Sequence, residues 1–412
     1  MRNVIWILFL LFTSGCSIHQ FNNNKLAEQL QHQGPENILA IIEEDTPNDR
    51  DLAQHNLNLG YLQLITGQFD AAITSLTQAN QEMLALSAAS ISENVAAGTI
   101  NETLRSYSGY PTDRVMVHTM LALSYLFNHN IDDARVEMLQ ADIAMKKLAD
   151  DDALSGQLAS SHLLSAIIYE LLDERSNAFI SYQLTKDILT QRNTAIPDAV
   201  KQGLLRMSYK MGNTSAYQQY RRQYPQLSKG DPNAKQVFSF YFDGVVSHKQ
   251  SQSITVPSHG GRQLIRIAMP AYAPIRYNKT TLTMDDQLHT KTSVIVENIE
   301  KRVREDLKKD YASILLATTT RAIAKDTVVK LANKKAPLLG AVFNVISLIS
   351  EMADTRSWNM LPANIQLGYL QTQASSVDLF AHSIKTQVDL SQAKQHVLFA
   401  SSLSDKIFHY QQ

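Results

Sequence analysis

Three windows in the first half of the chain share one helical pattern of hydrophobic and polar positions. They run from Leu59 to Ala79, from Leu121 to Ala141 and from Ser165 to Thr185. Each window places a small residue on a first helix, a second small residue twelve positions on and a bulky residue sixteen positions on. Small residues let two helices pack closely, and the bulky residue fills the gap between them. The pattern therefore predicts helix–turn–helix pairs stacked into an array.

The period of the pattern changes after a turn-rich segment, residues 228–232. Beyond it, apolar residues alternate with polar ones over short runs, which predicts β-strands. A helical period returns at about Lys291, continues through 294–307 and 312–331, and then gives way to strands again. The predicted strands are 237–242, 252–256, 264–268, 282–284, 365–370 and 396–400.

Together the two patterns predict a chain that is mainly α with an α+β C-terminal part. The first part resembles the tetratricopeptide repeat, which implies a helical superhelix, and the second is a small β-sheet domain with long inserted helices. The expected divisions are a signal peptide at 1–15, a flexible tether at 16–24, the helical repeat domain at 25–228 and the α+β domain at 233–412. Residues 25–228 are expected to fold alone as a soluble helical unit.

The tetratricopeptide resemblance also implies a candidate binding groove, because such arrays build their concave face from the first helix of each repeat. Most of the inward positions are apolar here, and soluble proteins avoid an open apolar patch of that size. We therefore expect the groove to be filled. Two kinds of occupant remain open: the protein's own chain, either the Leu84–Arg105 insert or a C-terminal helix, and a partner helix or lipid-like ligand. The candidate groove residues are Tyr61, Leu64, Leu123, Leu126, Phe127, Leu163 and Ile167.

The N-terminus has the features of a signal peptide. Arg2 precedes a run of apolar residues, 4–12, that is too short to span a ~30 Å hydrocarbon core. Cys16 resembles the lipobox cysteine of bacterial lipoproteins, which implies that it is lipidated and becomes the first residue of the mature chain. Ser17 stands where an aspartate would retain a lipoprotein at the inner membrane, so the resemblance implies an outer-membrane anchor with a periplasmic body. The apolar stretch Ala336–Met352 is expected to be a buried helix or, alternatively, a membrane-touching one.

Composition narrows the function classes. The chain has 412 residues, 38 basic and 39 acidic, and a net charge of −1. This balance argues against nucleic-acid binding, which needs clustered Lys and Arg. A single cysteine excludes an intramolecular disulfide and a Cys-rich zinc site. The sequence has no phosphate loop, HExxH, GxSxG or CxxC motif, so we expect no enzymatic activity, no cofactor and no metal.

A short run near residue 356 carries three candidate recognition residues, Asp354, Arg356 and Trp358. The first two could fix a turn through an ion pair and the third could anchor a core. Alternatively, the three could form a recognition surface, since Arg and Trp are frequent hot-spot residues. The stretch Glu297–Lys335 holds more basic than acidic residues. It is expected to be a solvated helix face or else a contact for anionic glycan or lipid headgroups.

The order of segments along the chain resembles an uncharacterised family of Gram-negative envelope lipoproteins. The segments are the lipobox, the repeats, Asp113-Arg114, Asp243-Gly244, Ala268–Tyr272, Arg321–Lys325, Ala353–Trp358 and Leu361–Ala363. The resemblance implies a role in cell-envelope or peptidoglycan assembly and names no reaction. We therefore expect a non-enzymatic scaffold that grips another envelope protein or peptide. The alternative is an envelope hydrolase or glycan-binding protein with its site in the α+β domain, which carboxylates of raised pKa in a cleft would favour.

Overall fold

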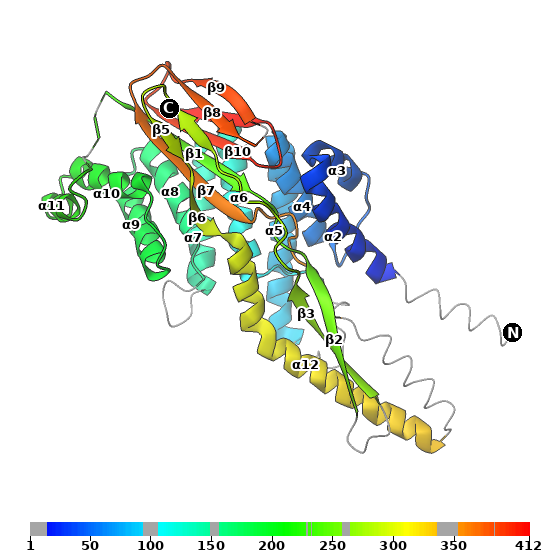
Figure 1. Cartoon of the computed structure of the whole chain (residues 1–412). Coiled ribbons are helices and arrows are strands. Elements are labelled where there is room, and N and C mark those ends of the chain that lie inside the picture. Colours follow the sequence, from blue (N-terminus) through cyan, green and yellow to red (C-terminus); the bar gives the residue numbers. More distant parts are fainter. Residues whose placement is uncertain are drawn as a thin grey trace.

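The computed structural model describes residues 15–93, 106–148, 156–227, 230–231, 233–257, 264–335, 353–382 and 384–412. Helices of the first half lie against strands of the second half, and a long helix projects from their junction beside a two-stranded hairpin (Figure 1). The chain is thus mainly α with an α+β C-terminal part, as the sequence predicts.

The helices of the first half follow the predicted repeat pattern. They are α2 (Gly15–Gln33), α3 (Pro35–Glu43), α4 (Leu52–Thr66), α5 (Phe69–Glu93), α6 (Pro111–Phe127), α7 (Ile131–Leu148), α8 (Ala159–Leu171), α9 (Arg175–Gln191), α10 (Asp198–Lys210) and α11 (Thr214–Gln223). The first small residue and the bulky residue of a repeat meet as expected. A Cβ placed on Gly60 of α4 would lie 2.5 Å from the Leu76 side chain of α5, so this helix pair needs glycine there. The predicted helix pairs are confirmed.

The segment expected to be a flexible tether, 16–24, is helical instead and forms the first turns of α2. Its last residues are fixed by the second half of the chain. Asn23 is buried, the Asn24 side-chain amide donates to the Lys249 carbonyl at 3.3 Å, and its oxygen accepts from Asn359 at 3.2 Å. The tether prediction is wrong because the segment is helical, with Asn23 buried and Asn24 hydrogen-bonded to the second half of the chain. These tertiary contacts override the local preference of asparagine for turns.

Within the described residues the strands form three sheets. They are β1 (Lys235–Asp243), β2 (Lys249–Pro257), β3 (Leu264–Tyr272), β4 (Thr283–Asp285), β5 (Thr290–Thr292), β6 (Val294–Asn298), β7 (Asn364–Thr372), β8 (Ser376–Ala381), β9 (Ile384–Asp389), β10 (Gln395–Ser401) and β11 (Ile407–Gln411). The main sheet has the order β11-β10-β1-β7-β6, a second has the order β5-β4-β8-β9, and β2 pairs with β3 as a hairpin. β1 runs parallel to β10 and antiparallel to β7, so strands far apart in the sequence are neighbours.

Each predicted strand overlaps an observed one, but the helix predicted to begin at about Lys291 starts later. Residues 290–298 contain β5 and β6, and α12 (Ile299–Lys335) begins directly after them. The Asn298 side chain accepts from the Lys301 backbone N–H at 2.7 Å and caps the helix there. The amphipathic period of 294–307 predicts a helix from its first residue, yet β6 pairs with β7 at the edge of the main sheet, and this pairing decides the structure of 294–298.

The hydrophobic core is continuous across the two halves. One cluster of buried side chains extends from Leu26 on α2 to Tyr410 on β11. A smaller cluster lies on the other side of the main sheet and includes Val237 of β1 and Leu379 of β8. The change of secondary structure near residue 230 therefore does not separate two independent cores.

Two elements extend away from this body, α12 and the β2–β3 hairpin, and we call them the arm (Figure 1). With 37 residues, α12 is about 55 Å long. Its Leu307 is still buried, whereas most described side chains from Lys308 to Leu316 are exposed. In the part of the chain that the structure describes, no helix has the length and apolar character to cross a membrane. The apolar stretch Ala336–Met352 lies outside the described residues.

Candidate functional site

The predicted concave groove is covered by the protein's own main sheet. Phe242 of β1 stacks on Tyr61 of α4 with ring centroids 6.4 Å apart. Phe399 of β10 and Phe408 of β11 lie 5.8 and 6.3 Å from the ring of Phe127 on α6. The candidate groove residues are all buried, with 0 to 5% exposure: Tyr61, Leu64, Leu123, Leu126, Phe127, Leu163 and Ile167.

This arrangement corrects the prediction in two respects. The groove residues form a core instead of a surface open to a partner, so a partner helix or lipid-like ligand is not what fills the groove. The occupant is the protein's own chain, but it is a sheet and neither the 84–105 insert nor a C-terminal helix. The described part of that insert continues α5 to Glu93, and residues 94–105 lie outside the described ranges. Pairing of distant strands creates the cover, which local periodicity does not reveal.

A buried ion pair completes the closure of the groove. Glu170 of α8 accepts hydrogen bonds from Arg206 Nε at 2.6 Å and Nη2 at 2.8 Å, and from the Tyr182 hydroxyl at 2.8 Å. Arg206 also donates to the Tyr369 hydroxyl of β7 at 3.3 Å. Burial acts to raise the pKa of Glu170, but the adjacent guanidinium outweighs it and holds that pKa below its usual value. Glu170, a polar residue at an inward position of the third repeat, is therefore paired with Arg206 inside the molecule.

Asp354, Arg356 and Trp358 lie in an irregular segment before β7, not on a strand. Asp354 accepts from Arg356 N at 3.0 Å, Nε at 2.9 Å and Nη2 at 2.7 Å. Arg356 Nη1 also contacts Asp51, next to the start of α4, at 3.3 Å. Arg356 and Trp358 are 4% and 1% exposed. The geometry therefore fits the structural alternative, in which an ion pair fixes the turn and the indole enters the core, and not a recognition surface.

Amide side chains join the helices to this same segment, and we call them the amide seam: Asn24, Gln54, Asn58 and Asn359. Gln54 donates to the Ser357 carbonyl at 2.6 Å, and Asn58 donates to Asn359 at 2.9 Å. Among the described residues, Gln54 Oε1 and Asn58 Oδ1 have no protein partner although they are buried. Ordered water would complete such a seam, because buried polar atoms are nearly always hydrogen-bonded.

A second polar region at this junction surrounds Lys249, the first residue of β2. Its side chain is fully buried, and Nζ lies 3.4 Å from the centroid of the Tyr110 ring and 3.3 Å from the Arg356 carbonyl oxygen. Nearby, Asp113 accepts from the Tyr107 hydroxyl and from the Tyr110 backbone N–H, the latter at 2.9 Å, and so caps the start of α6. We call Lys249, Tyr107, Tyr110, Asp113 and the α12 residue Asp306 the Lys249 cluster.

The pKa values of several ionisable groups in and beside the Lys249 cluster differ from their ordinary values. Burial lowers the pKa of Lys249 to about 8, although Asp113 and Asp354 oppose this effect. Burial raises the pKa of Asp306 to about 6, against hydrogen bonds from Thr112 that favour the charged form. The pKa of Asp113 is also raised by burial, as is that of Asp310 one turn further along α12. Displaced pKa values beside a cavity are a frequent property of functional sites.

A cavity of about 540 Å³ opens beside the Lys249 cluster, and we call it the Tyr110 cavity. It is lined by residues 106–111 and by Arg114, Pro270, Asp310, Ser313, Ile314, Asp354 and Arg356. Segments quoted above for the family resemblance meet here, although they are far apart in the sequence: Asp113-Arg114, Ala268–Tyr272 and Ala353–Trp358. Their convergence makes this the candidate site of the molecule.

The lining can recognise a polar ligand with several hydroxyl groups. Tyrosine rings offer flat apolar faces, Asp310 can accept hydrogen bonds, and Arg114 can donate them. The sequence gives no signal for Lys249, since a lysine at the start of an alternating run is ordinary in a solvated strand. Within the described ranges, no group of three or more His, Cys, Asp or Glu side chains is placed to hold a metal ion.

Exposed apolar side chains occur on the arm and on outer helices. Tyr311, Leu315 and Leu316 of α12 are 40, 45 and 70% exposed, and Ile254 of β2 is 63% exposed. Tyr311 and Leu315 are four positions apart and are neighbours on one face of the helix, whereas Leu316 lies about 100° around the helix axis from Leu315. Other exposed apolar side chains on the helical body are Leu84, Val136, Leu139, Ile180 and Tyr209.

Comparisons with known proteins give structural similarity only. No protein-family model and no curated protein matches the chain. The apo form of RapI shares 14% identity over 50% of this chain and 49% of its own, with a TM-score of 0.34, so the chain spans about half of RapI. A putative kinesin light chain from Podosopora anserina with TPR-like repeats shares 18% identity with this chain, with a TM-score of 0.34. The match covers 52% of this chain and 96% of the kinesin light chain structure. A Rap protein complexed with competence and sporulation factor shares 12% identity over 51% of this chain and 52% of its own, with a TM-score of 0.30. Similarity at this level does not extend to function.

Proposed function

We propose that this protein is an outer-membrane-anchored periplasmic lipoprotein that serves as a protein-binding scaffold in cell-envelope or peptidoglycan assembly. The observation that supports the proposal is the exposure of apolar side chains on the arm. The sheet fills the groove that a repeat array would use for binding, whereas Tyr311, Leu315 and Leu316 lie exposed on a projecting helix with Ile254 on the hairpin beside it. Apolar side chains grouped on a projecting element support a role in binding another envelope protein or peptide.

The anchor part of the proposal rests on the lipobox-like segment that ends at Cys16. Replacing Cys16 with Ser removes the acceptor thiol, so the protein should leave the membrane fraction and appear with soluble periplasmic proteins. Fractionation followed by immunoblotting measures this. Continued membrane association of Cys16→Ser would contradict a single lipid anchor and direct attention to Ala336–Met352.

The binding part of the proposal is tested by site-specific photo-crosslinking in cells. A photoreactive residue at position 316, on the arm, should give a discrete adduct with another envelope protein. The matched control is position 139 on α7, where Leu139 is also exposed, at 43%, but belongs to the helical body. Adducts at position 139 and none at position 316 would place the binding surface on the outer helices and overturn the role of the arm.

A second candidate function is glycan binding or glycan hydrolysis, and the Tyr110 cavity favours it. Burial raises the pKa of Asp310, which lines the cavity, and this supports the alternative. The cavity, however, uses residues 106–111 and Arg114 of the helical half as well as the α+β half. Co-sedimentation with purified peptidoglycan tests it. Asp310→Asn should reduce binding, whereas exposed Asp49→Asn should not, and release of soluble fragments would indicate hydrolysis. No sedimentation with the glycan would remove this candidate.

A further inference from the structure

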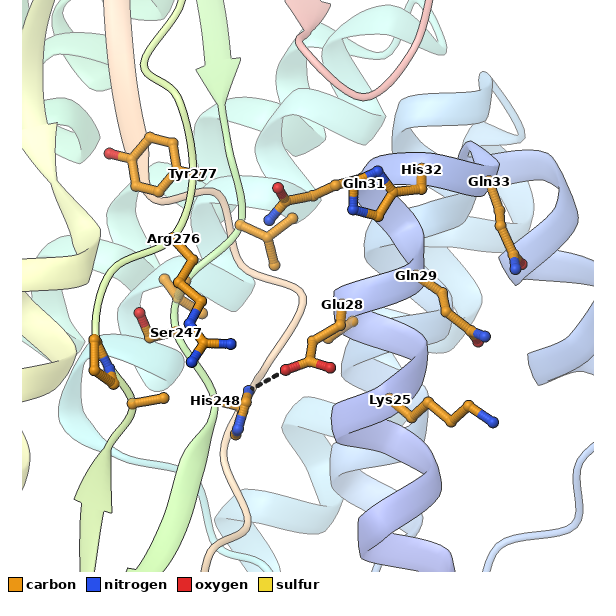
Figure 2. A pocket seen from close by; sticks show the side chains of 15 residues that line it. Lys25, Glu28, Gln29, Gln31, His32, Gln33, Ser247, His248, Arg276 and Tyr277 are labelled. Atoms are coloured by element: carbon orange, nitrogen blue, oxygen red, sulfur yellow. Dashed lines mark ion pairs between the residues drawn. The ribbon is translucent and has the colours of Figure 1, made fainter.

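A second cavity lies between the N-terminal helix and the segments that follow β1 and β3, and we call it the α2 cavity. Its volume is about 610 Å³, within the range of small-molecule sites. The α2 wall is formed by residues between Lys25 and Gln33, and the facing wall by residues 245–248, Ala273, Pro274, Arg276 and Tyr277. Figure 2 shows Glu28 and Gln31 directed from α2 toward the facing wall, from which Arg276 and His248 extend into the same space.

Charged side chains face each other across the cavity, and the Glu28–His248 contact is the ion pair that the structure shows between the two walls. Arg276 is exposed and forms no ion pair with any described residue, so its guanidinium group is available in the cavity. Glu28 on the other wall contacts His248 Nδ1 through Oε1 at 3.3 Å, which leaves its second oxygen for another donor. A guanidinium and a carboxylate held apart across a cavity match a ligand that carries a carboxylate and an ammonium group.

The facing wall is held in place by buried polar contacts. Glu300, at the start of α12, accepts from the Ser247 backbone N–H at 2.7 Å. Arg304, which pairs with Glu300, donates to the Ala273 carbonyl at 2.6 Å, and the Ala273 N–H donates to the His248 carbonyl at 2.9 Å. The two segments that carry His248 and Arg276 are therefore tied to each other and to α12. A wall fixed in this way loses little freedom when a ligand binds.

The α2 wall is equally well supported, and the cavity has an apolar base. Ala27 and Leu30 are buried against the body, which fixes the face of the helix that presents Glu28 and Gln31. Val245 and Val246 line the cavity with side chains only 4 and 5% exposed. An apolar side chain of a ligand would therefore find a complementary surface while its charged groups face Arg276 and Glu28.

We propose that the α2 cavity binds a small zwitterion with an apolar side chain, either a free amino acid or a short peptide with free termini. The carboxylate of the ligand pairs with Arg276, its ammonium group pairs with the free oxygen of Glu28, and Gln31 and Ser247 supply neutral hydrogen bonds. This site is independent of the scaffold proposal, because it uses no residue of the groove or of the exposed α12 surface.

Calorimetric titration of the full-length protein in detergent tests the proposal with defined probes. L-leucyl-L-leucine and L-leucine represent the two sources of the ligand, and the tighter of the two identifies which one the cavity fits. N-acetyl-L-leucinamide keeps the apolar side chain and lacks both charges, so it should bind at least tenfold more weakly. Failure of both zwitterions to bind, or equal binding of the uncharged analogue, would overturn the proposal.

Variants then assign the binding to this cavity. Arg276→Gln and Glu28→Gln should each weaken binding of the higher-affinity zwitterion about tenfold. Arg276→Lys, which keeps a positive charge, should lose less affinity than Arg276→Gln. Lys25→Gln is the matched control, because Lys25 lines the cavity rim but its ammonium end points away from the facing wall (Figure 2). All three positions are on the surface, and far-ultraviolet circular dichroism checks that folding is unchanged. Unaltered binding by both Arg276→Gln and Glu28→Gln would place the ligand elsewhere.

Discussion

The helices and the sheet meet at two junctions of opposite character. At the apolar junction, Phe242, Phe399 and Phe408 of the sheet pack on Tyr61 and Phe127 of the helices. At the polar junction, the amide seam and the Lys249 cluster connect α2, α4 and α6 to the 353–359 segment and α12. Both junctions hold the same two halves together, and the polar one borders the Tyr110 cavity, which is lined by charged side chains.

The difference between these junctions teaches which contacts stabilise the molecule and which define its geometry. Burying aromatic rings contributes free energy in proportion to area and tolerates small shifts. Buried amides and charges contribute less net free energy, but each demands a partner at a defined position. We therefore expect changes at the apolar junction to unfold the protein and changes at the polar junction to alter its pH dependence and its cavity.

The largest effect should come from removing the sheet altogether. The sequence pattern predicts that residues 25–228 fold alone as a soluble unit, but the continuous core reverses this expectation. Without β1, β10 and β11 the groove would expose an apolar face, so the shortened chain should aggregate or bind hydrophobic dyes. Size-exclusion chromatography and dye fluorescence measure this. A monomeric chain of 25–228 with a sharp thermal transition would show that the apolar junction is dispensable.

A single charge inside the apolar junction should have the next largest effect. Leu126→Asp places a carboxylate where the native side chain is 0% exposed, and we expect a loss of about 4 kcal/mol in the free energy of unfolding. Leu139→Asp on α7, where the leucine is 43% exposed, is the control and should change stability by less than about 0.5 kcal/mol. Denaturant unfolding followed by circular dichroism gives both values. Similar values for the two variants would mean that the groove is not closed in solution.

At the polar junction, removing the buried ammonium group of Lys249 should lower the free energy of unfolding by somewhat less than Leu126→Asp does. Lys249→Met keeps the length of the side chain but leaves the surrounding carboxylates without their cation, for which we expect a loss of about 3 kcal/mol near neutral pH. Lys301→Met, at a lysine that is 63% exposed, serves as the control and should be nearly neutral. A stabilised Lys249→Met variant would mean that the apolar character of this position outweighs its charge.

The smallest predicted effect is an increase in the free energy of unfolding, produced by a change at Asp306, and its size depends on pH. Burial raises the pKa of Asp306 in the folded state to about 6, above its ordinary value of 3.8, so the folded protein binds more protons than the unfolded chain between these values. The contribution of Asp306 to stability therefore falls as pH rises from about 4 to 6. Asp306→Asn, which stays neutral, should be more stable than the native protein by about 2 kcal/mol at pH 7.5. Unfolding curves at pH 4.5 and 7.5 test this, and an unchanged pH dependence would contradict the burial of a protonated Asp306.

The parts of the fold that could be predicted from the sequence are those with strong local periods. Helix pairs follow from the spacing of small and bulky residues, as at Gly60 and Leu76, and the longer strands follow from alternation. Short strands such as β8, β9 and β11 carry weaker patterns and were missed. The amphipathic period of 294–307 predicts a helix at β6, and only its pairing with β7 makes it a strand.

The candidate site was less predictable, because it forms from segments brought together only by the tertiary fold. The sequence singled out Arg356 and Trp358, but their roles depend on Asp51 and the core around α4, which no local pattern links to them. Lys249 drew no attention, since its burial results from the contact of β2 with the 107–110 and 356 segments. The apolar character of the groove positions follows from the repeat pattern, while the sheet that covers them cannot be inferred from periodicity.

The parallel pairing of β1 with β10 has a consequence for the way each new chain is made. Phe399, which packs on Phe127, is added about 270 residues later during synthesis. At about 5–20 residues per second, the groove segments are made roughly 15–50 s before the strands that cover them. We therefore expect the groove helices to reach their final packing only once the last strands have been made.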